Sequence, residues 1–298
     1  MFTEAEPRKY HSAIVDVTDR CNLRCRHCYY YREEHETQDL DKEEFLEGIQ
    51  TLRDRHDIRH MSWAGGEPLL RREVVEEGIG MFQRNVLNTN GLYPLPKWPR
   101  TNVWVSIDGP PETHDYIRGK GTYERVIENV KRSDCDLVVF CTTINKLNEL
   151  HLDAMLKGIA KIKKTALVFA FFTPLKNYQD IARYPHSGDQ KHRMPFTLEE
   201  RDRVIDRVLQ LKTKYPGYII NPDRALELMR SENSLSISQN CNMPLRSLTL
   251  DVQLNRRLPC VVSSDVDCDL CGCFFPYLTV ALREKDPEAM EFFSRGIH

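Results

Sequence analysis

The cysteines are the residues of this sequence best suited to chemistry. Ten occur among 298 residues, and eight of them fall into two groups, within residues 21–28 and 241–273. Thiolates are the ligands of zinc and of iron–sulfur clusters. In a chain without secretory features, dense thiol groups favour metal binding over a disulfide framework. The two groups therefore predict two metal sites, and the two separate residues, Cys135 and Cys141, are expected to be core thiols.

The first group reads Cys21-Asn-Leu-Arg-Cys25-Arg-His-Cys28. A cubane of four irons normally takes four thiolates, so three cysteines leave one iron without a protein ligand. An open coordination position is what allows a bound metal to act on another molecule. The alternative is a zinc site with a fourth ligand elsewhere, for which His27 is a candidate.

Short strands and helices alternate around this group. Apolar or β-rich runs predict strands at residues 13–17, 60–63, 85–88, 102–107, 137–143 and 166–172. Helical periodicity is found at residues 41–54, 71–81, 122–132, 147–163 and 197–214. This alternation predicts an α/β fold with a parallel sheet, curved into a partial (β/α)6 TIM-like barrel. Residues 91–100 contain three prolines, so the third and fourth strands are joined without a normal crossover helix.

Polar motifs directly follow four of the predicted strands. After the first strand comes the cysteine group; after the next three come Gly65-Gly66-Glu67-Pro68, Thr89-Asn90-Gly91 and Ser106-Ile107-Asp108-Gly109. Ligands on parallel sheets bind at the carboxyl ends of the strands, so these motifs are expected to form one site. Glycines let the backbone approach a ligand, and a carboxylate can accept hydrogen bonds from an ammonium group.

These motifs, in this order, resemble the radical SAM superfamily, whose signature is the same three-cysteine spacing on the same loop. The resemblance implies a [4Fe–4S] cluster on Cys21, Cys25 and Cys28, with S-adenosylmethionine (SAM) chelated to the open iron. It also implies an enzyme that cleaves SAM reductively to a 5′-deoxyadenosyl radical, which abstracts hydrogen from a substrate. The electron would come from an external donor of the flavodoxin or ferredoxin type.

The resemblance also implies cofactor-binding roles for residues outside the cysteine group. The backbone of His27 would lie near the adenine, Ser106 would contact the ribose, and Arg118 the SAM carboxylate. In the motif after the second strand, Gly65, Gly66 and Glu67 would contact the SAM amino group. Thr89, Asn90 and Asp108, from the motifs after the third and fourth strands, would also bind the cofactor.

The second group resembles the C-terminal SPASM or twitch domains of the same superfamily, which bind auxiliary [4Fe–4S] clusters. Five cysteines suffice for one cluster, so the shorter twitch form matches better. The expected ligands are Cys241, Cys260, Cys268 and Cys271, with Cys273 as substitute; the alternative is a structural zinc. A hairpin of residues 248–251 against 256–258 is predicted before this cluster.

The resemblance and the change of pattern predict two domains, a radical SAM core at residues 1–215 and a small cysteine-rich twitch-like domain at 216–298. Helix 221–230 would begin at Asn221 as its cap, with Pro222 in its first position. In the hairpin turn, Asn255 is expected to take the left-handed conformation that glycine usually supplies.

Composition narrows the function further. Hydrophobic residues make up 41%, charged residues 29%, and the net charge of −2 offers no bulk basic field for nucleic acid. The longest apolar run, residues 166–172, is too short to span a membrane, and residues 1–10 lack the apolar segment of a signal peptide. A cytoplasmic enzyme is expected, and a small-molecule or lipid substrate is favoured. The alternatives are a peptide- or protein-modifying maturase, and an iron–sulfur electron carrier or zinc-stabilised binding protein without SAM chemistry.

Overall fold

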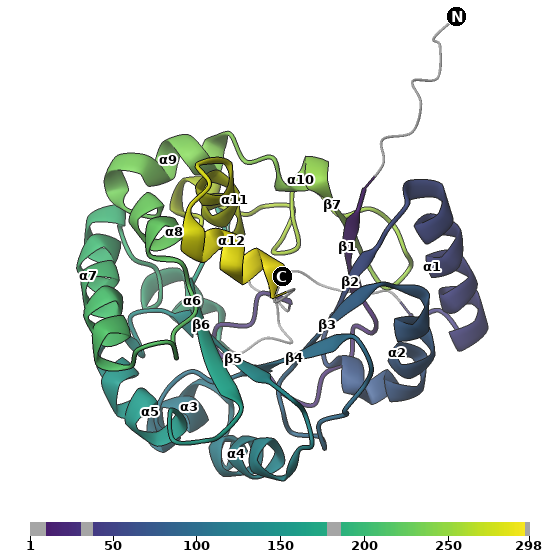
Figure 1. Ribbon diagram of the computed structural model, residues 1–298, viewed down its shortest axis with the longest axis horizontal. Coiled ribbons are helices and arrows are strands. Elements are labelled where there is room, and N and C mark those ends of the chain that lie inside the picture. The colour runs from purple at the N-terminus through teal and green to yellow at the C-terminus, as the bar shows by residue number, and fades with distance from the viewer. Residues whose placement is uncertain (1–9, 31–37, 178–185, 296–298) are drawn as a thin grey trace, which may run out of the picture.

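The computed structural model describes residues 10–30, 38–177 and 186–295. Its centre is a seven-stranded parallel sheet in the order β6-β5-β4-β3-β2-β1-β7. The strands are β1 (Ser12–Asp16), β2 (His60–Ala64), β3 (Arg84–Thr89), β4 (Thr101–Ser106), β5 (Val138–Ile144), β6 (Thr165–Phe171) and β7 (Ser247–Leu250). They curve into a partial ring with most of the helices around its outside (Figure 1). The predicted α/β partial barrel is confirmed, and a seventh strand extends it.

The helices follow the predicted alternation. Up to residue 214 they are α1 (Lys42–His56), η2 (Pro68–Arg71), α2 (Arg72–Gly78), η3 (Ile79–Met81), α3 (Pro111–Arg118), α4 (Thr122–Arg132), η4 (Glu149–His151), α5 (Leu152–Ile159), α6 (Ser187–His192) and α7 (Leu198–Lys214). Beyond it are α8 (Asp223–Leu228), α9 (Ser231–Gln239), α10 (Met243–Arg246), η5 (Cys268–Leu270), α11 (Phe275–Arg283) and α12 (Pro287–Ser294). Helix α7 begins with a capping box of Thr197 and Glu200.

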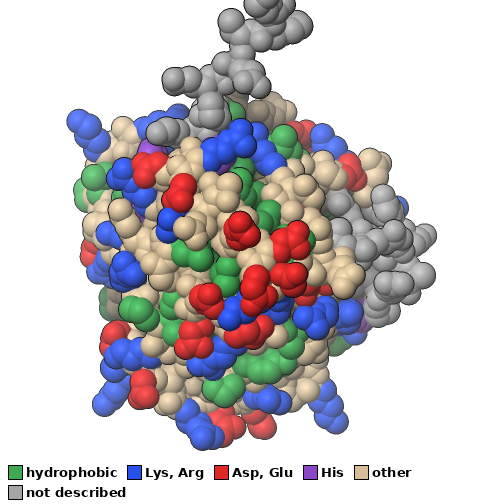
Figure 2. Space-filling model, turned by 90° about the vertical axis from the view of Figure 1, so that its right-hand side faces the viewer, with side chains coloured by type: hydrophobic (Ala, Val, Ile, Leu, Met, Phe, Trp, Pro, Cys, Tyr) green, Lys and Arg blue, Asp and Glu red, His purple; other side chains and the backbone are tan. Residues whose placement is uncertain are grey.

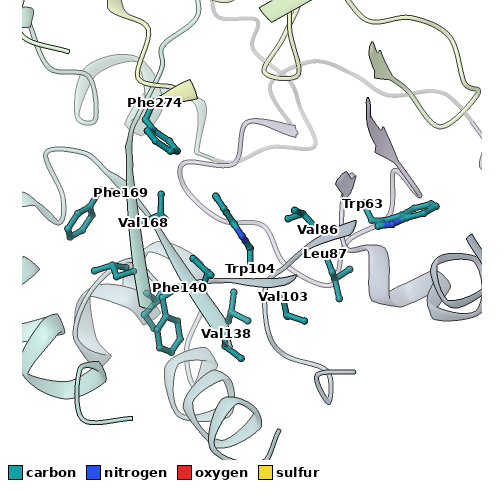
Figure 3. Close-up of a cluster of buried hydrophobic side chains, with 14 of the residues drawn as sticks. Trp63, Val86, Leu87, Val103, Trp104, Val138, Phe140, Val168, Phe169 and Phe274 are labelled. Atoms are coloured by element: carbon teal, nitrogen blue, oxygen red, sulfur yellow. The ribbon is translucent and has the colours of Figure 1, made fainter. Parts of the chain in front are cut away.

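Side chains of the strands alternate between two environments. Leu87, Val103 and Phe140 are fully buried and point away from the barrel interior, whereas Trp104 points into it (Figure 3). Full burial of such an apolar side chain contributes about 1.5–3 kcal/mol. The outward faces of the strands therefore form the hydrophobic core with the helices. The inward faces carry smaller and more polar residues, many only half-buried.

Strand β7 differs from the hairpin that was predicted for it. It pairs in parallel with β1, and its hairpin contact is reduced to one antiparallel bridge between Leu250 and Arg256. The left-handed residue of the turn is Leu254, with φ 61°, so the prediction for Asn255 was wrong. The carboxylate of Asp251 accepts the amides of Gln253 and Asn255 and fixes the turn in this register.

The prediction that Asn221 caps a helix was also wrong. Pro222 occupies the N-cap of α8. The buried amide of Asn221 instead donates to the carbonyl of Phe169 at 2.9 Å and accepts from its N–H at 2.7 Å. This side chain satisfies the backbone of β6 as a neighbouring strand would. It ties the segment after α7 to the last strand of the barrel.

Residues after the predicted boundary at residue 215 share the core of the barrel. Side chains from α8, β7, α11 and α12 belong to the same buried hydrophobic cluster as those of β1 to β6. The division into domains at residues 1–215 and 216–298 stays a prediction.

No helix in the described part of the chain is long and apolar enough to cross a bilayer. On the face beside α1 and α2, acidic and basic side chains are interspersed (Figure 2). This mixture agrees with the small net charge of the sequence.

Replacing Asn221 by Ala is expected to destabilise the fold by about 1–3 kcal/mol, because two buried backbone groups of Phe169 lose their partner. Urea denaturation followed by circular dichroism measures the loss. Gln210→Ala, at an exposed position of α7, is the control and should change stability by less than about 0.5 kcal/mol. Equal stability of the two variants would refute this role of Asn221.

Candidate active site

The loop that carries the first cysteine group is held by main-chain bonds to the loop after β2. Beyond the ends of the strands, the N–H of Gly66 donates to the carbonyl of Thr18 at 2.8 Å, and that of Glu67 to Arg20 at 2.9 Å. A Cβ on Gly66 would lie 2.1 Å from the oxygen of Arg20. Gly65 has a φ of 115°, which disfavours any other residue. The glycine pair is needed for this close contact.

The three thiols of the loop converge. The pKa of Cys25 is raised to about 12, mainly by burial. The thiolates of Cys28 and Cys21 would repel that of Cys25 and contribute to this rise. Burial also raises the pKa of Cys21 to about 11, with Cys28 again contributing. Burial disfavours the ionisation of Cys21 and Cys25, so these thiols need a cationic centre to become thiolates.

Glu67 joins the ends of β2 and β3. Its side chain is fully buried; Oε1 accepts from Thr89 Oγ1 at 2.8 Å and Oε2 from the N–H of Asn90 at 2.8 Å. Burial raises the pKa of Glu67 to about 7, against the lowering effect of these hydrogen bonds. Its carboxylate is directed at the Thr89-Asn90 turn, so the two motifs form one unit.

Asn90 connects that unit to the cysteine loop. Its Nδ2 donates to Oδ1 of Asn22 at 2.8 Å and lies 3.9 Å from Sγ of Cys21. Its Oδ1 accepts from the N–H of Leu92 at 3.0 Å, which fixes the orientation of the amide. The predicted grouping of the first three motifs is therefore seen in direct contacts.

The fourth motif contributes a buried ionic cluster. Asp108 Oδ2 contacts Arg118 Nε at 2.5 Å and His27 Nε2 at 2.6 Å, and Oδ1 accepts from the N–H of Thr143 at 3.0 Å. Burial raises the pKa of Asp108, but Arg118 and His27 lower it more, to well below its usual range. Arg118 Nη1 is 3.9 Å from Sγ of Cys25. The ionised carboxylate of Asp108 thus holds Arg118 beside Cys25, the most buried of the three thiols in the loop.

His114 supports this cluster from α3. Its Nδ1 accepts the backbone N–H of Asp108 at 3.1 Å. Burial and the charge of Arg118 lower the pKa of His114 to about 4, so the ring is neutral at pH 7.

Ser106, at the end of β4, belongs to a half-buried inward face. By strand parity and register, this face also includes Ser62, Asn88, Cys141 and Thr143. Cys141 was expected to be a core thiol, yet it is paired with Ser106 on the neighbouring strand and lies on this face. Burial, together with the charge of Asp108, raises the pKa of Cys141 to about 12, and the charge of Arg118 opposes this rise. The alternation of side chains along the strands, counted from Ser106, could have placed Cys141 on this face from the sequence. Cys135 is buried as expected and donates to the carbonyl of Pro96.

The second cysteine group also converges, near the end of β6. Burial raises the pKa of each thiol, and each pKa is raised further by at least one other member of the set Cys241, Cys260, Cys268, Cys271 and Cys273. Gly272 secures the group: its carbonyl accepts from Phe171 N–H at 2.8 Å, and its N–H donates to Thr173 Oγ1 at 2.8 Å. A Cβ there would lie 2.1 Å from the oxygen of Phe171.

An ion pair connects the end of β1 with the segment that precedes Cys260. Asp16, at the end of β1, pairs with Arg257, whose guanidinium also lies over the ring of Tyr30. The charge of Arg257 lowers the pKa of Cys260, although burial raises it overall. The second group is therefore attached to the same edge of the barrel as the first.

Thiol spacing distinguishes a cluster from a single ion. Thiolates on one tetrahedral zinc lie about 3.8 Å apart, given Zn–S bonds of about 2.3 Å. Thiolates of a cubane bind different irons and are farther apart. Among residues 10–30, 38–177 and 186–295, no three or more His, Cys, Asp or Glu side chains are grouped to hold a metal ion.

Comparison with known proteins agrees with this geometry. Residues 15–159 match the family model of the radical SAM superfamily. A probable GTP 3′,8-cyclase of Methanocella arvoryzae is 26% identical over 285 residues, which cover 89% of this chain and 86% of that protein. Pre-heme d1 synthase of Dinoroseobacter shibae is 33% identical over 181 residues, 53% of this chain and 43% of that protein. The chain thus spans less than half of that second relative.

Solved structures show the same fold. The structure described as native anSMEcpe with bound AdoMet and Kp18Cys peptide superposes with a TM-score of 0.61 at 18% identity, covering 94% of this chain and 82% of that one. The family model and the relatives support the radical SAM superfamily, whose members are enzymes, for this chain, and the solved structure shows that the fold is shared.

Proposed function

We propose that this chain binds a [4Fe–4S] cluster through Cys21, Cys25 and Cys28 and uses it for the reductive cleavage of SAM. The observation that carries the proposal is that the loop bearing these three thiols is held by hydrogen bonds from the residues that follow β2 and β3. A fourth thiol would close the site, and the motif supplies none. When bound there, the cluster would supply the electron that splits SAM into methionine and a 5′-deoxyadenosyl radical.

The residues around the loop have separable tasks in this proposal. Gly65 and Gly66 keep the loop in place and allow close approach of the SAM amino group. Arg118 is held by Asp108 and lies beside Cys25, where its positive charge can attract the carboxylate of SAM. The half-buried Ser106 lies at the end of β4, where it can contact the ribose.

The second cysteine group is proposed to bind an auxiliary [4Fe–4S] cluster in a twitch-like domain. Its five converging thiols exceed the four that such a cluster takes. Thiol-rich sites persist in a reducing compartment, which supports a cytoplasmic location and an external donor of the flavodoxin or ferredoxin type.

The inward face of the barrel favours a polar small molecule as substrate. Hydroxyl, amide and thiol groups of Ser62, Asn88, Ser106, Cys141 and Thr143 are only half-buried there. An aliphatic lipid would offer these groups no hydrogen bonds, although Asn88 already donates to Ser62 Oγ at 2.8 Å. The names of the cyclase and the heme d1 enzyme point to small molecules too. The peptide in the solved structure makes a peptide substrate the alternative outcome of a substrate screen.

Cys25→Ala is expected to abolish SAM cleavage, because the cluster loses a ligand in the centre of the loop. The measurement is 5′-deoxyadenosine formed by anaerobically reconstituted, dithionite-reduced protein. Cys135→Ser is the matched control, since its side chain can keep the bond to Pro96 outside the site, and it should retain activity. A wild-type protein that forms no 5′-deoxyadenosine would contradict the proposal.

Gly66→Ala should displace the cysteine loop, because the new Cβ meets a backbone oxygen that cannot rotate away. We expect a loss of SAM cleavage of at least tenfold and a lower iron content after reconstitution. Gly80→Ala, where no atom lies within 4 Å of the added Cβ, is the control. Wild-type iron content and activity in Gly66→Ala would show that the clamp is not required.

A further inference from the structure

Arg201 of α7 is a buried cation whose hydrogen-bond partners are neutral. Its side chain is 1% exposed. Nη1 donates to the carbonyl of Cys271 at 2.8 Å and to Ser234 Oγ at 3.3 Å, and Nη2 donates to the carbonyl of Leu270 at 3.0 Å. Its Nε is buried without a hydrogen-bond partner in the described structure. By contrast, the partly buried Arg257, which also acts on the second cysteine group, has Asp16 as a counter-ion.

No ion pair joins Arg201 to the carboxylate of the next residue, Asp202. Asp202 follows it on α7, but its two oxygens accept from the N–H and hydroxyl of Ser231 at 2.8 and 2.5 Å. Tyr277 is neutral at pH 7, because burial raises the pKa of its phenol to about 12. An unpaired charge in a protein interior is costly, and arginine stays charged under all ordinary conditions. Among the described residues, no carboxylate forms an ion pair with Arg201, although the charge of Asp202 raises its pKa, so an anion in direct contact is lacking there.

The second cysteine group can supply that anion. Arg201 holds both carbonyls of the Leu270-Cys271 peptide segment. Burial lowers the pKa of Arg201, and Cys271 is among the groups whose negative charge would raise it. A [4Fe–4S] cluster bound by four thiolates carries a net negative charge. One-electron reduction adds one more negative charge to it. A buried cation beside it stabilises the reduced form more than the oxidised form.

We infer that Arg201 is the counter-cation of the auxiliary cluster, a positioning residue that raises the reduction potential of that cluster. The inference rests on the proposed second cluster. The competing explanation is purely structural: Arg201 could hold the turn of residues 268–271 by its hydrogen bonds alone. Charge and hydrogen bonding must therefore be separated.

Two substitutions separate them. Arg201→Gln keeps hydrogen-bond donors and loses the charge; Arg201→Lys keeps both a donor and the charge. Each is made in full-length protein with Cys21, Cys25 and Cys28 replaced by Ala, so that only the second cluster is observed. Iron content and an EPR-monitored redox titration of the reconstituted protein give cluster loading and midpoint potential.

The charge role predicts that Arg201→Gln binds the cluster but has a lower potential than the parent, while Arg201→Lys stays close to it. A tenfold fall in the ratio of reduced to oxidised cluster at fixed potential corresponds to about 59 mV. Arg230→Gln is the control, because Arg230 is paired with Glu227 and Asp206, and its potential should match the parent.

Equal potentials, equal shifts, or equal losses of iron in Arg201→Gln and Arg201→Lys would overturn the inference, since charge would then be irrelevant. An iron-free parent protein would instead refute the second cluster itself, and the inference with it. These outcomes are distinguished by the iron content of the parent.

Discussion

The position of the cysteine loop depends on main-chain hydrogen bonds that continue the β1–β2 pairing beyond both strands. The loop has little regular structure of its own, so its thiols can converge only if its backbone is held from outside. Gly66 and Glu67 hold it through their amide groups, and Asn90 holds it through its side chain. The close contact at Gly66 excludes even a methyl group. The chemistry proposed for the loop therefore rests on the end of an adjacent strand.

Buried charges complete this arrangement. Glu67 and Asp108 are both fully buried, but their surroundings affect them in opposite directions. Burial raises the pKa of Glu67, whereas Arg118 and His27 keep Asp108 ionised in spite of burial. Breaking one member of a buried ion pair typically costs 3–5 kcal/mol, so the position of Arg118 beside Cys25 is strongly determined. The protein can thus present a fixed positive charge next to a thiol without solvent.

Much of this was predictable from local patterns. Strand and helix periodicity identified the barrel, and strand-end motifs identified the edge where the site lies. Contacts between residues distant in sequence were not predictable: His27 with Asp108, β7 with β1, or Asn221 with Phe169. The amide of Asn221 suits a helix cap as well as a strand backbone, and only the tertiary structure decides between them. Arg201 looked like an ordinary helix residue, because nothing local indicates that its helix faces a cysteine group.

The central claim is that three thiolates leave one iron free for SAM. Electron–nuclear double resonance on the reduced protein with SAM labelled with ¹⁵N at its amino group tests this directly. A hyperfine coupling between that nitrogen and the cluster electron spin is predicted. A reduced cluster with SAM bound and no such coupling would show that the iron is not available, and would contradict the claim.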